Sequence, residues 1–171
     1  DTVLPGRDNI SFTVQNGDGP HLLLNGHTDT VSVTGMSIDP FSGDVRDGRL
    51  WGRGASDMKG PLACMLAALL ALRTRDDWRG RVTVGCVVDE ETEYRGILKL
   101  IEDQAPWDYA VVGEPTGLRV VRGCKGSVRL HVRVRGRAAH SSDPSQGRNA
   151  IVGMAPVLEA IQAFFDEEIG R

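Results

Sequence analysis

The chain has few cysteines, few aromatic residues and no long apolar run. These shortages exclude several classes of protein and of binding site. Only three cysteines occur among 171 residues, and no two form a CxxC pair. The sequence therefore supports neither a disulfide framework nor a structural zinc knuckle, and a reducing, cytoplasmic setting is expected. The longest apolar run, residues 62–72, is well short of the ~20 residues that a membrane span needs. We expect no membrane partner.

Neither acidic nor basic residues are in large excess. The formal net charge is −3, with 25% charged and 40% apolar residues, which is ordinary globular composition. Arginines alternate along residues 129–137, but no aromatic side chains lie between them, so this stripe indicates an exposed sheet face and not a nucleic-acid surface. We expect no nucleic-acid partner. The length suits one domain, or one and part of another.

Apolar patterning predicts an α/β fold with a largely parallel sheet flanked by helices. The predicted strands are residues 9–15, 21–25, 82–88 and 109–112, and the predicted helices are residues 62–72 and 97–101. Turn residues between the first two strands predict a hairpin. Residues 62–72 are apolar nearly all round, which predicts a well-buried helix. The unbroken apolar runs 82–88 and 109–112 predict strands that are covered on both faces.

The pattern changes after Gly117. Residues 127–137 alternate strictly between apolar and polar, which predicts a strand with one solvated face. Residues 149–165 then predict an amphipathic helix. We therefore expect a first domain over residues 1–125 and the beginning of a second over residues 126–171.

Side chains that can bind a metal follow each buried strand of the first domain. They are His27, Asp29, Asp89, Glu90, Glu91 and Glu114, and Asp57 stands in a glycine-rich loop before the apolar helix. Parallel strands end at one sheet edge, where ligands bind in this class of fold. Converging carboxylates repel one another, so cations must offset them. One imidazole among several carboxylates suits zinc, with cobalt or manganese as substitutes. The number of acids favours two metal ions, ~3.5–4 Å apart.

Spacing separates some of the roles. Asp29 lies two residues after His27, on the same side of an extended chain, where it can accept the second ring N–H of the imidazole. Glu90 and Glu91 are adjacent and point in different directions. One can bind metal while the other serves as a general base, and spacing alone leaves open which does which.

Four motifs together resemble the M20 metallopeptidase/deacylase family, whose catalytic domain has a di-zinc exopeptidase-like fold. They are His27-Thr28-Asp29-Thr30, Gly54-Ala55-Ser56-Asp57-Met58-Lys59-Gly60, Asp89-Glu90-Glu91 and Gly113-Glu114-Pro115-Thr116. The resemblance implies metal ligands His27, Asp57, Glu91 and Glu114, a general base Glu90, and Asp29 as the partner of His27. It also implies that Asp57 bridges two zinc ions and precedes a cis peptide bond.

The resemblance extends into the second domain, which looks like the start of an α+β lid, or dimerisation, domain. It implies a homodimer in which His140 stabilises an oxyanion in the partner subunit. Lys125 could meet a substrate carboxylate. The family's fifth ligand is a later histidine, and His21, at the far end of its strand, and His131, on a polar strand face, do not fit that role. We therefore expect this chain to be a fragment that is inactive alone.

The resulting hypothesis is a zinc-dependent amidohydrolase that removes an N-acyl group from a small amino-acid derivative, as acetylornithine deacetylases do. Within the same family, a carboxypeptidase, a dipeptidase or a desuccinylase is the alternative. A magnesium-dependent phosphoryl-transfer domain is a different class, but it fits His27 poorly because magnesium favours oxygen ligands. A folded, non-catalytic piece is the third hypothesis.

Overall fold

The computed structural model describes residues 1–104 and 106–168, and it divides into two compact units, Asp1–Arg122 and Gly123–Arg171. This division comes three residues before the boundary expected after residue 125. The first unit contains the sheet and all the residues expected to bind metal.

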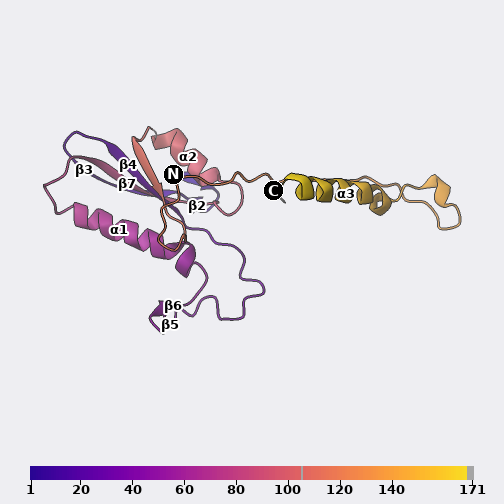
Figure 1. Cartoon of the computed structure of the whole chain (residues 1–171), viewed down its shortest axis with the longest axis horizontal. Coiled ribbons are helices and arrows are strands. Elements are labelled where there is room, and N and C mark those ends of the chain that lie inside the picture. The colour runs from indigo at the N-terminus through magenta and orange to yellow at the C-terminus, as the bar shows by residue number, and fades with distance from the viewer. Residues whose placement is uncertain (105, 169–171) are drawn as a thin grey trace. The chain divides into compact units, whose positions relative to one another are not determined.

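A four-stranded sheet in the order β3-β7-β4-β8 forms the centre of the first unit (Figure 1). Its strands are β3 (Ile10–Asn16), β4 (His21–His27), β7 (Gly80–Val87) and β8 (Tyr109–Val112). β4 is parallel to β7 on one side and to β8 on the other, whereas β3 is antiparallel to β7. The predicted α/β class is confirmed, and the sheet is parallel apart from one edge strand.

Helices cover both faces of this sheet. α1 (Gly60–Leu72) packs Leu62, Met65 and Leu69 against the face that includes Val84. α2 (Arg95–Gln104) places Leu100 on the other face with Leu23 and Val87. Two short antiparallel ribbons complete the unit: β1 (Thr2–Leu4) with β2 (Arg7–Asp8), and β5 (Val45–Arg46) with β6 (Arg49–Leu50).

The predicted hairpin of the first two strands is wrong. β7 lies between β3 and β4 and pairs with both, so the connection from β3 to β4 crosses the start of β7. Close backbone approach makes the crossing possible: a Cβ at Gly80 would lie 2.4 Å from the Pro20 carbonyl oxygen, which accepts the N–H of Arg81 at 2.9 Å. Gly80 has φ +125°, a conformation that few other residues adopt.

Two predictions of burial are also wrong. α1 buries one side only, because the sheet covers one side, and Cys64 and Leu70 on its outer side are exposed. β8 is an edge strand in the described part of the sheet, and Tyr109, Val111 and Val112 are each more than half exposed. By length and composition alone, the helical stretch Ala55–Leu72 could cross a membrane. Its inner side packs on the sheet, as a core helix of an α/β unit does.

The second unit contains a short 3-10 helix at Pro144–Gln146 and the long helix α3 (Ala150–Glu168). The helix predicted over residues 149–165 is therefore confirmed. The strand predicted over residues 127–137 is wrong for the described chain, where only Arg137 pairs, in an isolated antiparallel bridge with Arg148. An alternating segment becomes a strand only when a neighbouring strand takes its backbone hydrogen bonds.

Candidate metal centre

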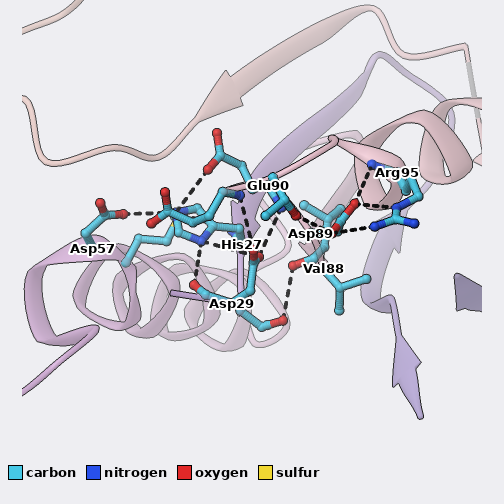
Figure 2. A network of polar contacts seen from close by, with 12 residues as sticks. His27, Asp29, Asp57, Val88, Asp89, Glu90 and Arg95 are labelled. Carbon is cyan, nitrogen blue, oxygen red and sulfur yellow. Dashed lines mark hydrogen bonds and ion pairs between the residues drawn. The ribbon is translucent and has the colours of Figure 1, made fainter. Parts of the chain in front are cut away.

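The residues of the centre come from the ends of three parallel strands and from the turn before α1. Figure 2 shows Asp29, Asp57 and Glu90 around His27. His27 is the last residue of β4 and is 2% exposed. Glu90 and Glu91 follow β7, and Glu114 follows β8. Asp57 lies in a kinked turn, Ala55–Lys59, immediately before α1. The parallel pairing of β4 with β7 and β8 brings these distant residues together.

Both ring nitrogens of His27 face oxygen atoms. Nδ1 lies 2.8 Å from the main-chain carbonyl oxygen of Asp29, and Nε2 lies 2.9 Å from Oδ1 of Asp57. A carbonyl oxygen only accepts hydrogen bonds, so Nδ1 is the donor. A neutral ring then presents the Nε2 lone pair to a carboxylate, and this contact is favourable only with a cation, either a proton or a metal ion.

Asp29 holds His27 in a different way from the one expected. Its carboxylate is 3.7 Å from Nδ1, beyond hydrogen-bond distance, and the main-chain carbonyl takes the ring N–H instead. The carboxylate accepts the main-chain N–H groups of Glu90 and Glu91, both at 3.1 Å. Asp29 therefore orients the imidazole through its backbone and anchors the loop after β7 through its side chain, as Figure 2 shows.

Two groups of side chains have the spacing of metal ligands. Ligand atoms of His27, Asp57 and Glu114 lie within 4.8 Å of one another, and so do those of His27, Glu90 and Glu91. The first group is the set expected to hold one metal ion. His27 is common to both groups, whereas Asp57 was expected to be the shared residue. A bridging role for Asp57 stays a prediction.

Two carboxylates of the centre, those of Glu90 and Glu114, have raised pKa values. Burial raises the pKa of Glu90, and the charges of Glu91, Asp29 and Asp57 raise it further against the opposing effect of His27. Burial and the charges of Asp57 and Glu90 likewise raise the pKa of Glu114. Clustered acids with raised pKa values form a site in which a bound cation relieves repulsion.

The same environment acts on His27 in the opposite sense. Burial lowers the pKa of the imidazole, but the acceptors on Asp29 and Asp57 and the charge of Glu90 outweigh burial, so the pKa is raised overall. A metal ion at Nε2 of His27 would therefore compete with a proton.

Met58 is a buried residue that contacts the main chain of His27. It is 1% exposed, its peptide bond with Asp57 is cis, as the resemblance implied, and its Sδ accepts the main-chain N–H of His27 at 3.0 Å. A Cβ at Gly26 would lie 2.3 Å from Met58 Cε. The thioether thus contacts the last two residues of β4, which is a contact that the sequence did not indicate.

Asp89 follows β7 like its neighbours but turns away from the centre. Its carboxylate, 1% exposed, accepts hydrogen bonds from the guanidinium of Arg95, at 2.7 Å from Nε, and from the hydroxyl of Thr92. These donors hold the pKa of Asp89 far below its usual range. Asp89 is a cross-link within the loop and not a metal ligand.

Lys125 and His140 belong to the second unit. Nδ1 of His140 accepts the main-chain N–H of Ser142 at 3.3 Å and lies 2.8 Å from its hydroxyl oxygen. An accepting Nδ1 places the ring proton of a neutral imidazole on Nε2. The expected roles of Lys125 and His140 stay predictions.

The sequence profile of Peptidase family M20/M25/M40 matches residues 23–170. The chain belongs to this family. M20 membership agrees with the four motifs and with the gathering of their acids around His27.

Curated relatives give the same assignment. An acetylornithine deacetylase of Vibrio vulnificus is 40% identical over 96% of this chain, and a succinyl-diaminopimelate desuccinylase of Methylorubrum extorquens is 38% identical over 85% of it. The M20 chain described here spans 44% and 42% of their respective lengths, less than half of each.

Among solved structures, a tripeptidase of Staphylococcus aureus matches 88% of the chain, and the chain covers 42% of it, with a TM-score of 0.56 at 22% identity. An M20 family metallo-carboxypeptidase of Sulfolobus solfataricus matches 61%, and the chain covers 25% of it, with a TM-score of 0.55 at 24% identity. These likenesses show the shared fold of the M20 chain.

Proposed function

We propose that the full-length protein is a metal-dependent amidohydrolase that removes an N-acyl group from a small amino-acid derivative. The observation that carries the proposal is the gathering of Asp57, Glu90, Glu91 and Glu114 around the buried imidazole of His27. Membership of the M20 family and the 40% identity with an acetylornithine deacetylase support it. A cytoplasmic location is part of the proposal.

The donor set fits zinc, with cobalt or manganese as substitutes. His27 has its Nδ1 proton engaged by a carbonyl, so Nε2 is available as a ligand. His27, Asp57 and Glu114 would hold one ion, and Glu91 with Asp57 would help to hold a second, so that the complete subunit contains two. A bound divalent ion polarises the scissile carbonyl and lowers the pKa of water.

Glu90 is the proposed general base. Its carboxylate lies 3.9 Å from Nε2 of His27, it is about one-third exposed, and its pKa is raised by burial. A raised pKa brings a carboxylate closer to the operating pH, where it accepts a proton from water and passes it to the leaving amine more readily. The Asp29 carboxylate holds the main chain of Glu90 in place during these transfers.

His140 is the proposed oxyanion donor, acting from the partner subunit of a homodimer formed through the second unit. The tautomer set by Ser142 leaves an N–H on Nε2, the group that a developing oxyanion requires. Lys125 is proposed to bind a substrate carboxylate. Neither residue needs to be a metal ligand for these roles.

The test is hydrolysis by the full-length protein after removal of metal and reloading with zinc or magnesium. N-acetylornithine should be hydrolysed with zinc and not with magnesium. Turnover only with magnesium, or phosphoryl transfer in its place, would contradict the proposal. N-succinyl-diaminopimelate belongs in the same assay, because the 38% identity with a desuccinylase favours that substrate as the second candidate.

A further inference from the structure

Asn9 is a buried polar residue that contacts the loop bearing two acids of the metal centre. It lies between β2 and β3 and is 4% exposed. Its Nδ2 donates to the main-chain carbonyl of Gly96 at 2.7 Å, and its Oδ1 accepts the main-chain N–H of Val88 at 3.1 Å. Val88 and Gly96 immediately flank residues 89–95, so one side chain ties together both ends of that loop.

The two ends of the loop are in direct contact at this point. A Cβ at Gly96 would lie 2.1 Å from the Val88 carbonyl oxygen and 2.9 Å from Oδ1 of Asn9. Val88 and Gly96 are both buried. An amide supplies a donor and an acceptor together, and an apolar side chain at position 9 would leave two main-chain groups without these partners in a place where water does not easily replace them.

Three side chains form hydrogen bonds that stabilise this loop. The Asp29 carboxylate accepts the N–H groups of Glu90 and Glu91, in the first half of the loop. Asp89 joins it internally to Arg95 (Figure 2). Asn9 closes its base from a segment about 80 residues earlier in the chain. The base sets the direction in which the chain leaves β7, and therefore the approach of Glu90 and Glu91 to His27.

We propose that Asn9 is a positioning residue of the metal centre, which acts through the loop by joining Val88 to Gly96. This inference rests on the proposed function in one respect, namely that Glu90 and Glu91 serve as base and ligand. The hydrogen bonds themselves do not depend on it.

The experiment compares Asn9→Ala with a matched control, Asn16→Ala. Asn16 is at the opposite end of β3, and its Nδ2 also donates to a main-chain carbonyl, that of Trp78, at 2.9 Å. Amide hydrogen exchange is measured on the folded, metal-free chains. Asn9→Ala should speed exchange at Glu90 and Glu91 by ~10-fold or more relative to Asn16→Ala, because only the local opening of this loop becomes easier. Cobalt affinity should fall by ~10–100-fold in Asn9→Ala and stay unchanged in Asn16→Ala.

Equal exchange at Glu90 and Glu91 in the two variants, corrected for their global stability, would overturn the proposal. Asn9→Asp is measured alongside, because it keeps the acceptor for the Val88 N–H and loses the donor to the Gly96 carbonyl. If Asn9→Ala does not fold, Asn9→Asp is compared with Asn16→Ala in its place. Normal exchange and normal cobalt binding in Asn9→Asp would equally overturn the proposal. Failure of the unmodified chain to bind cobalt would count against the proposed function instead, since the exchange measurement needs no metal.

Discussion

The imidazole of His27 determines the charge balance of the centre. Its two nitrogens face the Asp29 carbonyl and the Asp57 carboxylate at 2.8 and 2.9 Å. One nitrogen can donate in the neutral ring, so the second contact needs a proton or a metal ion. Metal binding should therefore release protons and weaken as pH falls.

Substitution of Glu90 tests its proposed role as the general base. In the full-length enzyme, Glu90→Gln should lower kcat by ~10²–10⁴-fold, the usual scale for loss of a positioned base, while metal content is retained. Glu91→Gln is the matched neighbour and should lose metal instead. Steady-state kinetics with metal analysis of both variants checks the assignment. Normal turnover of Glu90→Gln would give the role to another residue.

The ionised carboxylate of Glu114 should lower the stability of the metal-free chain. Its raised pKa means that the folded state binds more protons than the unfolded state just above the ordinary glutamate pKa, so stability falls as pH rises through that window. Glu114→Gln should raise the thermal midpoint of the metal-free chain at pH 7, because the neutral amide neither loses hydration of a charge on burial nor repels Asp57 and Glu90. It should also weaken metal binding. Calorimetry with and without zinc measures both effects, and a lower midpoint without metal would contradict the prediction.

At the scale of elements, the sequence predicted that the acids after the parallel strands lie at one edge of the sheet. It did not predict the order of the strands. Acids after runs such as residues 82–88 and 109–112 point to one sheet edge, since parallel strands share a direction. The pairing of β3 with β7 joins residues about 70 positions apart, and apolar alternation contains no information about which strand is the neighbour. The contacts of Asn9 escaped prediction for the same reason, because a lone asparagine before a strand has no pattern.

The crossing over β7 depends on Gly80. Gly80→Ala should lower the free energy of unfolding by ~2–3 kcal/mol, because it adds a contact of 2.4 Å with the Pro20 carbonyl to an unfavourable φ of +125°. Gly35→Ala is the matched control: its φ is +80°, but a Cβ there meets nothing within 4 Å, so the cost should be ~1 kcal/mol. Urea unfolding of both variants gives the comparison. Equal losses would show that crowding at the crossing is unimportant.

At the scale of the whole molecule, the proposed dimer makes a prediction about subunits. Mixing full-length His140→Ala with full-length Glu90→Gln should restore part of the activity when subunits exchange, because one site of each heterodimer then has an intact base and an intact histidine from its partner. Each parent alone should be nearly inactive. Verified heterodimers without recovery would show that His140 does not act across an interface.

The 171-residue chain alone should bind one metal ion per chain and should not hydrolyse N-acyl amino acids. A catalytic zinc ion normally has three protein ligands, and His27, Asp57 and Glu114 provide one such set. The second set in the described residues reuses His27. Once that imidazole is engaged, the second proposed ion has two protein ligands, Glu91 and the shared Asp57, one fewer than a catalytic zinc ion normally has. Zinc titration of the chain beside the full-length protein, with an assay on N-acetylornithine, is the measurement. Two tightly bound ions per chain, or robust turnover, would mean that a further ligand lies within these 171 residues.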